Sequence, residues 1–310
     1  MPSLLRKLED LLNPYKGFFI KYNDILDATN HFHTTNIIQQ VEKYNHVYRG
    51  KLIRFGTRIN VIVEKRLNMT AEELLKLVSM ISRFKHKNIA TFVGFSYSLD
   101  LVYDAIADNC IAYIVSDGEV KESLSQSQNI VHVFSSSYNN FDYVYYKLTC
   151  SQRIQICMDA ARALSYIHDC DAIHGDFRST SVLLTEDLEV KVVCLVIIPE
   201  NSTFSHYTDL DFSVTQKSDV YSFGVVLKDL FCQQYLNPSR SGNTANFRFY
   251  FDDDIREQLH SQAFLILSET IDRCLNAQHQ RRPNMDETVK LLDKALFLQR
   301  RHENPVRQSF

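Results

Sequence analysis

The stretch from residue 150 to residue 230 constrains the fold most, because a polar loop lies there between two apolar helices. The first helix has apolar residues at helical spacing and leads directly into the loop Ile173-His174-Gly175-Asp176. A short apolar run, Val182-Leu183-Leu184, follows the loop, and residues 218 to 230 have the composition of a second buried helix. We expect the two helices and the loop to form the core of a helical C-terminal lobe. The face of the first helix consists of Ile154, Cys157, Met158, Ala161, Leu164 and His168.

The N-terminal half has the pattern of strands. Residues 36 to 67 alternate in polarity, and residues 60 to 65 are rich in β-branched side chains. A capping box at residues 70 to 73 then starts a helix with apolar residues at i, i+3, i+4 and i+7. The chain therefore reads as a small strand-rich half followed by a larger helical half.

Composition limits the class of protein. The chain has 310 residues, 45% of them hydrophobic and 23% charged, so it can bury a full core. A net charge of -3 without a Lys/Arg run argues against a nucleic-acid partner and against a polybasic membrane anchor. The sequence has no apolar run of the roughly 18 residues needed to span a bilayer, and Met1-Pro2 begins neither a secretory leader nor a myristoylation signal.

Cysteine usage indicates the compartment. The seven cysteines are an odd number and form no Cys-x-x-Cys pair, which is typical of reduced thiols in a cytosolic protein. We expect a cytoplasmic protein without a transmembrane segment. Peripheral association with the cytoplasmic face of the plasma membrane through a partner is left open.

Several motifs occur in the order and at nearly the spacing found in one family. The loop at residues 173 to 184 resembles a protein kinase catalytic loop, and residues 217 to 224 resemble the helix behind it. From about Tyr22 to Gln299 the chain is similar to plant receptor-like and receptor-like cytoplasmic kinases. Residues 198 to 200 are also similar to the cytoplasmic pseudokinases that serve as adaptors of NLR immune receptors. The matching stretches are residues 24–32, 86–89, 101–104, 160–168, 217–227 and 282–285.

The resemblance implies an α+β, bilobal protein-kinase fold with a five-stranded N-lobe. It places an N-terminal helical leader at residues 1–31, the N-lobe at 32–103 and the C-lobe at 104–310. The hinge between the lobes would lie at Asp104 to Ile106. Residues 116–147, rich in Ser, Asn and Tyr, would be an insertion in the C-lobe.

The N-lobe departs from the kinase pattern at the positions that hold ATP. The three glycine positions of the phosphate loop are Gln40, Glu42 and Asn45, and Glu42 adds a negative charge where the triphosphate would lie. The resemblance places Lys65 at the phosphate-binding lysine. Leu77 replaces the helix glutamate that pairs with this lysine, although Glu73, one turn earlier, is an alternative partner. The residual ATP pocket would consist of Lys65, Val47, Val63, Asp104, Ile106 and Leu183.

The C-lobe keeps one catalytic position and loses the metal ligands. Asp176 matches the residue that accepts the substrate proton, and Arg178 replaces the catalytic lysine, so both are vestigial candidates for catalysis. Ser181 replaces the magnesium-binding asparagine, and Cys194 replaces the aspartate of the Asp-Phe-Gly turn. A thiol cannot replace a carboxylate toward magnesium, so we expect no metal site. Asp219 should anchor the backbone of the catalytic loop.

These losses predict a catalytically impaired kinase-like domain that acts as a scaffold or adaptor in plant receptor or immune signalling. Two alternatives stay open: a residually active serine/threonine kinase, and a switch that binds ATP without turnover. We expect no required cofactor and leave open weak ATP binding without magnesium. The expected partners are proteins: a receptor-like kinase, an immune receptor or a substrate kinase.

Two segments outside the cleft are candidates for contact with such partners. The first is the leucine stripe of residues 4 to 12, which has the alternative of packing on the protein's own body. The second is the tyrosine-rich segment of residues 138 to 146, which has the alternative of a surface insertion without a partner.

Overall fold

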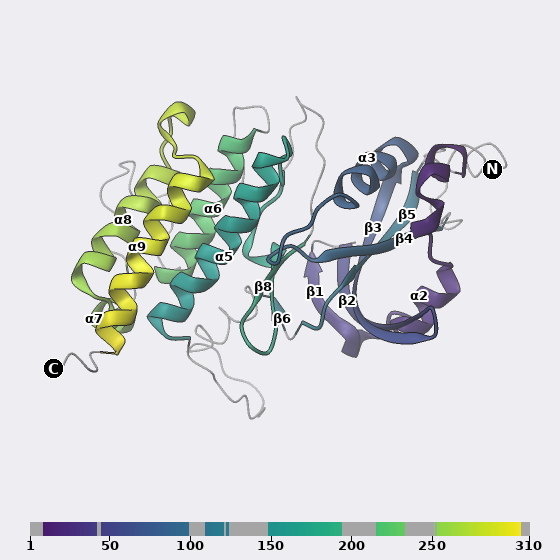
Figure 1. Cartoon of the computed structure of the whole chain (residues 1–310), viewed down its shortest axis with the longest axis horizontal. Helices are drawn as coiled ribbons and strands as arrows, with labels where there is room; N and C mark the ends of the chain where they lie inside the picture. The colour runs from purple at the N-terminus through teal and green to yellow at the C-terminus, as the bar shows by residue number, and fades with distance from the viewer. Residues whose placement is uncertain are drawn as a thin grey trace, which may run out of the picture.

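The computed structural model describes residues 9–41, 45–98, 109–120, 122–123, 148–193, 215–232, 251 and 253–304. It has two lobes: a sheet with the helices α2 (Tyr22–Ala28) and α3 (Ala71–Ile81) on the N-terminal side, and a helical body on the C-terminal side (Figure 1). The predicted α+β, bilobal kinase fold is confirmed.

The N-lobe sheet has five strands, all antiparallel to their neighbours, in the order β1-β2-β3-β5-β4. Strands β2 and β3 form a hairpin whose turn residues, Phe55 and Gly56, have φ angles of 49° and 75°, as the right-handed twist of hairpins favours. The strands are β1 Ile37–Val41, β2 Asn45–Arg54, β3 Thr57–Thr70, β4 Thr91–Ser98 and β5 Asn109–Asp117.

The predicted helix after β3 is present as α3, Ala71–Ile81. Thr70 caps it by accepting from the Glu73 backbone N–H, while the Glu73 carboxylate accepts from the Thr70 N–H at 2.8 Å. The four apolar residues of its predicted face are all buried. Glu73 is therefore used as a cap, which removes it as the alternative partner for a cleft lysine.

The predicted hinge and lobe boundary are wrong. Strand β5 pairs with both β3 and β4, so residues 109–117 belong to the N-lobe sheet although the predicted N-lobe ended at residue 103. The connection to the C-lobe runs through residues 118–120, after which β6, Glu122–Ser123, pairs with the C-lobe strand β7. The predicted insertion consequently begins too early, since Ser116 and Asp117 are strand residues. Asp104 and Ile106 lie outside the described residues.

The C-lobe is built on α5, which packs against α6 and α9. A small sheet, β6-β7-β8, lies between this body and the N-lobe. One buried apolar cluster runs from α3 through the C-lobe helices. The elements are α5 Cys150–Asp169, β7 Val182–Leu184, β8 Val190–Val192, α6 Gln216–Phe231, α7 Asp253–Gln258, α8 Ser261–Cys274 and α9 Met285–Glu303.

The N-terminal leader packs on the protein's own body where it is described. Residues 9–12 are helical, Leu12 is buried in the main core and Leu11 packs against it. The leader continues through the 3-10 helix η1, Asn13–Phe18, into α2, Tyr22–Ala28, which covers the outer face of the sheet. The three N-terminal leucines of the stripe and the tyrosine-rich segment lie outside the described residues. Within the described part of the chain, no helix is long and apolar enough to cross a membrane.

Candidate functional site

The loop that carries Asp176 is held by a buried carboxylate on α6. Asp219 is 1% exposed and accepts from the backbone N–H of His174 at 2.7 Å and of Gly175 at 2.9 Å. It also lies 2.9 Å from His168 Nε2 at the end of α5. Gly175 has a φ of 82°, a conformation that a side chain would strain. The predicted anchoring role of Asp219 is thus carried by three hydrogen bonds.

His174 braces the same loop from the inside. Its ring is fully buried, and Nε2 lies 3.0 Å from the Val193 carbonyl oxygen, so it donates there. Burial lowers the pKa of His174 below its usual value, although the nearby carboxylates of Asp219 and Asp176 oppose that shift. The neutral ring therefore links the loop to the end of β8, as the kinase pattern implies.

The two vestigial catalytic candidates of the loop, Asp176 and Arg178, bind each other. Arg178 Nε donates to Asp176 Oδ1 at 2.6 Å, and the side chains are 12% and 20% exposed. Ser181 Oγ donates to the Asp176 carbonyl oxygen at 3.2 Å and accepts from the Arg178 N–H at 3.3 Å. Asp176 accordingly has a cationic partner, and the Ser181 hydroxyl is used in closing the loop.

The alternation of β3 places a carboxylate, and not a lysine, on the face toward the C-lobe. In the β2–β3 register Val47 lies opposite Glu64, so their side chains share a face. Val47 and Ile62 are buried together with Leu183 of the C-lobe. Glu64, two residues after Ile62, therefore occupies the inner position at which a kinase has its phosphate-binding lysine.

The assignment of Lys65 to the nucleotide site is wrong. Lys65 lies opposite Tyr113, which is buried under α2 on the outer face of the sheet. The Lys65 ammonium lies 5.4 Å from the centroid of the Phe32 ring, a cation–π geometry. Val63, predicted to line the ATP pocket, belongs to the same outer cluster. Because strand side chains alternate, a one-residue difference in alignment moved both residues to the wrong face.

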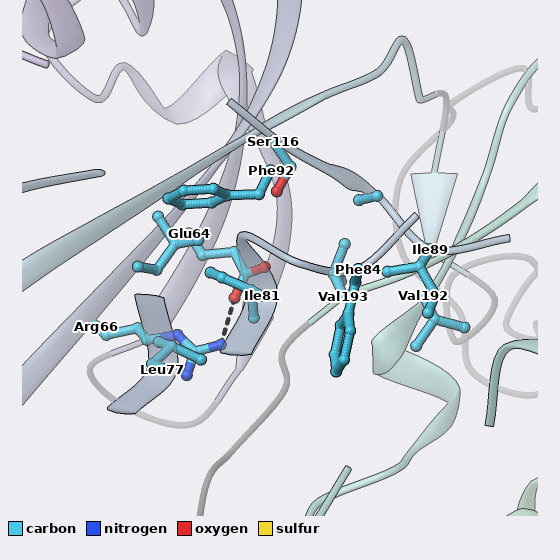
Figure 2. A pocket seen from close by; sticks show the side chains of 12 residues that line it. Glu64, Arg66, Leu77, Ile81, Phe84, Ile89, Phe92, Ser116, Val192 and Val193 are labelled. Carbon is cyan, nitrogen blue, oxygen red and sulfur yellow. Dashed lines mark hydrogen bonds and ion pairs between the residues drawn. The ribbon is translucent and has the colours of Figure 1, made fainter. Parts of the chain in front are cut away.

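The inner face carries an ion pair between two residues of the same strand. Glu64 is 5% exposed, and Arg66 Nη2 donates to its Oε2 at 2.7 Å (Figure 2). Leu77 and Ile81 of α3 lie beside the pair. A cavity of about 20 Å³ is enclosed there, which is room for about one water molecule. A kinase has an ion pair between a strand lysine and a helix glutamate. In this chain it is replaced by the ion pair within β3, between Glu64 and Arg66, which packs on Leu77 and Ile81.

Apolar side chains from both lobes pack together where the sequence predicted the residual ATP pocket. Six residues from both lobes form one buried cluster, each no more than 6% exposed. Val47 and Leu183 were predicted members, whereas the other four were missed. Ile62 takes the place of the small residue that leaves room for adenine in the kinase pattern. The cluster consists of Ile38, Val47, Ile62, Val120, Leu183 and Val193.

The sequence held a signal for the missed residues. Counted by twos from Val61, the strand places Val61, Val63 and Lys65 on one face and Ile62, Glu64 and Arg66 on the other. The β3–β5 pairing has a register irregularity between Arg66 and Met69, so the count by twos applies only up to Arg66. Which face is the inner one is decided by the partners of the sheet.

The described residues do not fit ATP with magnesium. Glu64, which is neutralised by Arg66, offers the phosphates no cation, the predicted pocket residues Val47 and Leu183 are buried in the six-residue cluster, and the Ser181 hydroxyl is committed to the loop. Cys194 and Glu42 lie outside the described residues, as do Asp104 and Ile106. Gln40 and Asn45 are strand residues of the β1–β2 pair.

The cysteines offer no reactive thiolate in the core. Six of the seven are described and are free. Burial raises the pKa of Cys110 to about 11 and of Cys232 and Cys274 to about 12, so their thiols stay protonated. These residues serve packing.

Comparison with known proteins agrees with the bilobal kinase fold. The family model described as protein tyrosine and serine/threonine kinase matches residues 37–208 and 199–292. Similar curated proteins, all from Arabidopsis thaliana, include the receptor-like protein kinases THESEUS 1, HERK 1 and FERONIA. Each is 26% identical to this chain, and the matches cover 93%, 91% and 90% of it, respectively. The matched region is 35%, 35% and 32% of those proteins, so the chain spans about a third of their length.

Proposed function

The chain belongs to the protein tyrosine and serine/threonine kinase family, and we propose that it is a catalytically impaired member that acts as a scaffold or adaptor in receptor signalling. The observation that carries the proposal is the inner face of β3. There Ile62 and Glu64 stand where a kinase needs a small residue and a lysine, and Arg66 neutralises Glu64 at 2.7 Å.

The electrostatics of the cleft support impairment. Phosphoryl transfer depends on positioning and on neutralising the charge of the phosphates, and single elements of that kind contribute about 10³ to 10⁵ in rate. In this chain a carboxylate that Arg66 neutralises replaces the cation, so the positive charge that a kinase offers to the phosphates is lost at that position. A thiol at position 194 in place of the metal-binding carboxylate adds to the loss.

The retained framework supports a role through contact. Asp219 still holds the loop, and the lobes are joined through buried apolar side chains at the predicted nucleotide pocket. A filled cleft gives a rigid body whose outer surfaces are available to protein partners. Since the curated relatives are receptor-like kinases, a receptor-like kinase or an immune receptor is the proposed partner class, at the cytoplasmic face of the plasma membrane.

The first test is nucleotide binding by the full chain. We expect millimolar ATP, with or without magnesium, to leave the melting temperature unchanged, because stabilisation follows occupancy of the folded state. A matched variant, Ile62→Ala with Glu64→Lys, reopens the base position and restores the cation. This variant should gain a measurable ATP-dependent shift. A shift of several degrees in the unaltered chain would favour the ATP-binding switch and contradict the proposal.

The second test separates contact from catalysis. Radiolabelled phosphate transfer from ATP to a generic protein substrate should be at background, and Asp176→Asn should not lower it further. Capture of protein partners from the source tissue should be the same for Asp176→Asn as for the unaltered chain. If transfer is detected and Asp176→Asn abolishes it, the alternative of a residually active serine/threonine kinase is correct.

A further inference from the structure

A second cavity, of about 420 Å³, lies where the end of α2, strands β2 and β3, and residues 118–120 meet, and it borders the six-residue cluster of the cleft at Val120. Its size is within the range of sites for small molecules. Three cations, Arg49, Lys51 and Arg58, line it together with Asp27 and Glu119. Glu119 Oε2 accepts from the Asn60 side-chain amide at 3.0 Å. The lining thus offers donors for an anion and carboxylates that accept from hydroxyl groups.

The tip of the β2–β3 hairpin next to this cavity is apolar and exposed. Ile53, which lies opposite Arg58 in the register, is 70% exposed, and Phe55 at the turn is 94% exposed. Phe55 has a φ of 49°, which is unfavourable for a bulky side chain. The structure therefore presents this phenylalanine to solvent at a conformational cost, where a polar turn residue would fit better.

The hairpin tip is fixed to the leader. Arg54 Nη2 donates to the Gly17 carbonyl oxygen at 3.2 Å, and Arg54 Nη1 donates to the Val93 carbonyl oxygen. Phe18, which follows Gly17 in the leader, is 36% exposed. A held tip can present its side chains to a surface without the ordering cost of a free loop.

The hairpin has a charge opposite to that of the whole chain. Residues 49 to 58 contain four cations and no acidic residue, while the chain has a net charge of -3. Basic residues next to exposed aromatic and aliphatic side chains are typical of surfaces that bind anionic membranes.

We propose that the 420 Å³ cavity binds the phosphorylated polyol headgroup of an anionic lipid. At the same time, Ile53 and Phe55 insert into the bilayer at the boundary between headgroups and acyl chains. The phosphates bind Lys51, Arg58 and Arg49, and the polyol hydroxyls donate to the carboxylates of Asp27 and Glu119. The site borders the cleft at Val120, but its charged residues are not members of the cleft cluster, so the proposed membrane contact does not depend on the proposed function.

The experiment measures flotation of the full chain with vesicles of phosphatidylcholine, of phosphatidylcholine with phosphatidylserine, and of phosphatidylcholine with a phosphatidylinositol phosphate at equal total charge. We expect binding to the phosphoinositide vesicles, weaker binding to the phosphatidylserine vesicles and none to phosphatidylcholine. Soluble inositol polyphosphate should bind and should compete with the vesicles. Equal binding to both anionic vesicles, without competition, would overturn the headgroup site.

Variants separate the cavity from the tip. Lys51→Gln with Arg58→Gln should weaken both vesicle and soluble-headgroup binding by about 10- to 30-fold, the loss of two charges near an anionic surface. Phe55→Ser should weaken vesicle binding by about tenfold and leave binding of the soluble headgroup unchanged. The matched controls are Lys290→Gln with Lys294→Gln, and Phe297→Ser, whose side chains are exposed on α9; they should change neither.

Each contrary result has a definite meaning. If the α9 controls lose as much binding as the hairpin variants, the attraction is non-specific and the proposal is wrong. If the unaltered chain binds no vesicle and no headgroup, while Phe55→Ser loses a protein partner, the tip is a protein contact and the lipid site is overturned.

Discussion

The catalytic loop and the inner face of β3 lie on opposite sides of the same cleft, yet they differ in how much of the kinase pattern they keep. At the loop, Asp219 of α6 accepts from two backbone N–H groups, as the pattern implies, and His174 braces the loop against Val193. On β3, Glu64 and Ile62 replace the residues that would contact a nucleotide. The loop residues hold backbone in place, whereas the β3 positions matter only when a ligand is present. Groups that the fold needs are kept, and groups that only a ligand needs are replaced by side chains that pack.

The largest expected effect breaks the framework side of this comparison. Asp219→Ala leaves two buried N–H groups and the His168 ring without their acceptor, so we expect a loss of about 3–5 kcal/mol in the free energy of unfolding. Urea denaturation measures it. The matched control is Asp176→Ala, whose half-buried carboxylate forms an ion pair with Arg178; it should cost no more than about 1 kcal/mol. Equal losses would show that the loop has no special anchor.

The next prediction tests the ion pair on the inner face of β3. Glu64→Leu leaves the Arg66 guanidinium without its buried partner, and we expect a loss of about 3 kcal/mol. Glu64→Leu combined with Arg66→Met replaces the whole pair by apolar side chains, and it should recover most of that loss. A double variant as unstable as the single one would mean that the pair is needed for more than mutual compensation.

The pH dependence gives a smaller effect. Burial lowers the folded-state pKa of His174 and of His86, while both titrate near 6.5 when unfolded. Below that pH the unfolded state binds more protons, so stability is complete above about pH 6.5 and is lost as pH falls, by at most about 1.4 kcal/mol per pH unit for each histidine. Urea midpoints at several pH values measure the slope. His174→Gln should reduce the slope; a slope unchanged by this substitution would contradict the role of the buried ring.

The smallest effect concerns the lysine that the sequence placed in the cleft. Lys65→Met removes a cation–π contact with Phe32 on the outer face, and we expect a loss of about 0.5 kcal/mol. The response to ATP should be the same as that of the unaltered chain. If Lys65→Met removes an ATP-dependent stabilisation, the inner-face position of Glu64 is refuted.

Much of the fold could be predicted from local pattern. The capping box at Thr70 and Glu73 and the spacing of the α3 leucines give that helix with its start, because both signals act within one or two turns. The α5 face and the loop after it are local for the same reason. The hinge could not be placed in this way, since residues 101–104 resembled the last N-lobe strand and only pairing with β3 and β4 identifies β5 as that strand.

The sequence by itself determined the kinase family, the helices of the C-lobe and the loop that presents Asp176. Only the tertiary structure decided that Glu64 faces inward and Lys65 outward. Both faces of β3 are buried, with Val61 and Val63 under α2 and Ile62 against Leu183, so the apolar pattern does not distinguish them. The side-chain period of two then makes a single residue the difference between a cation and a carboxylate in the cleft, and that choice is fixed by contacts far apart in the sequence.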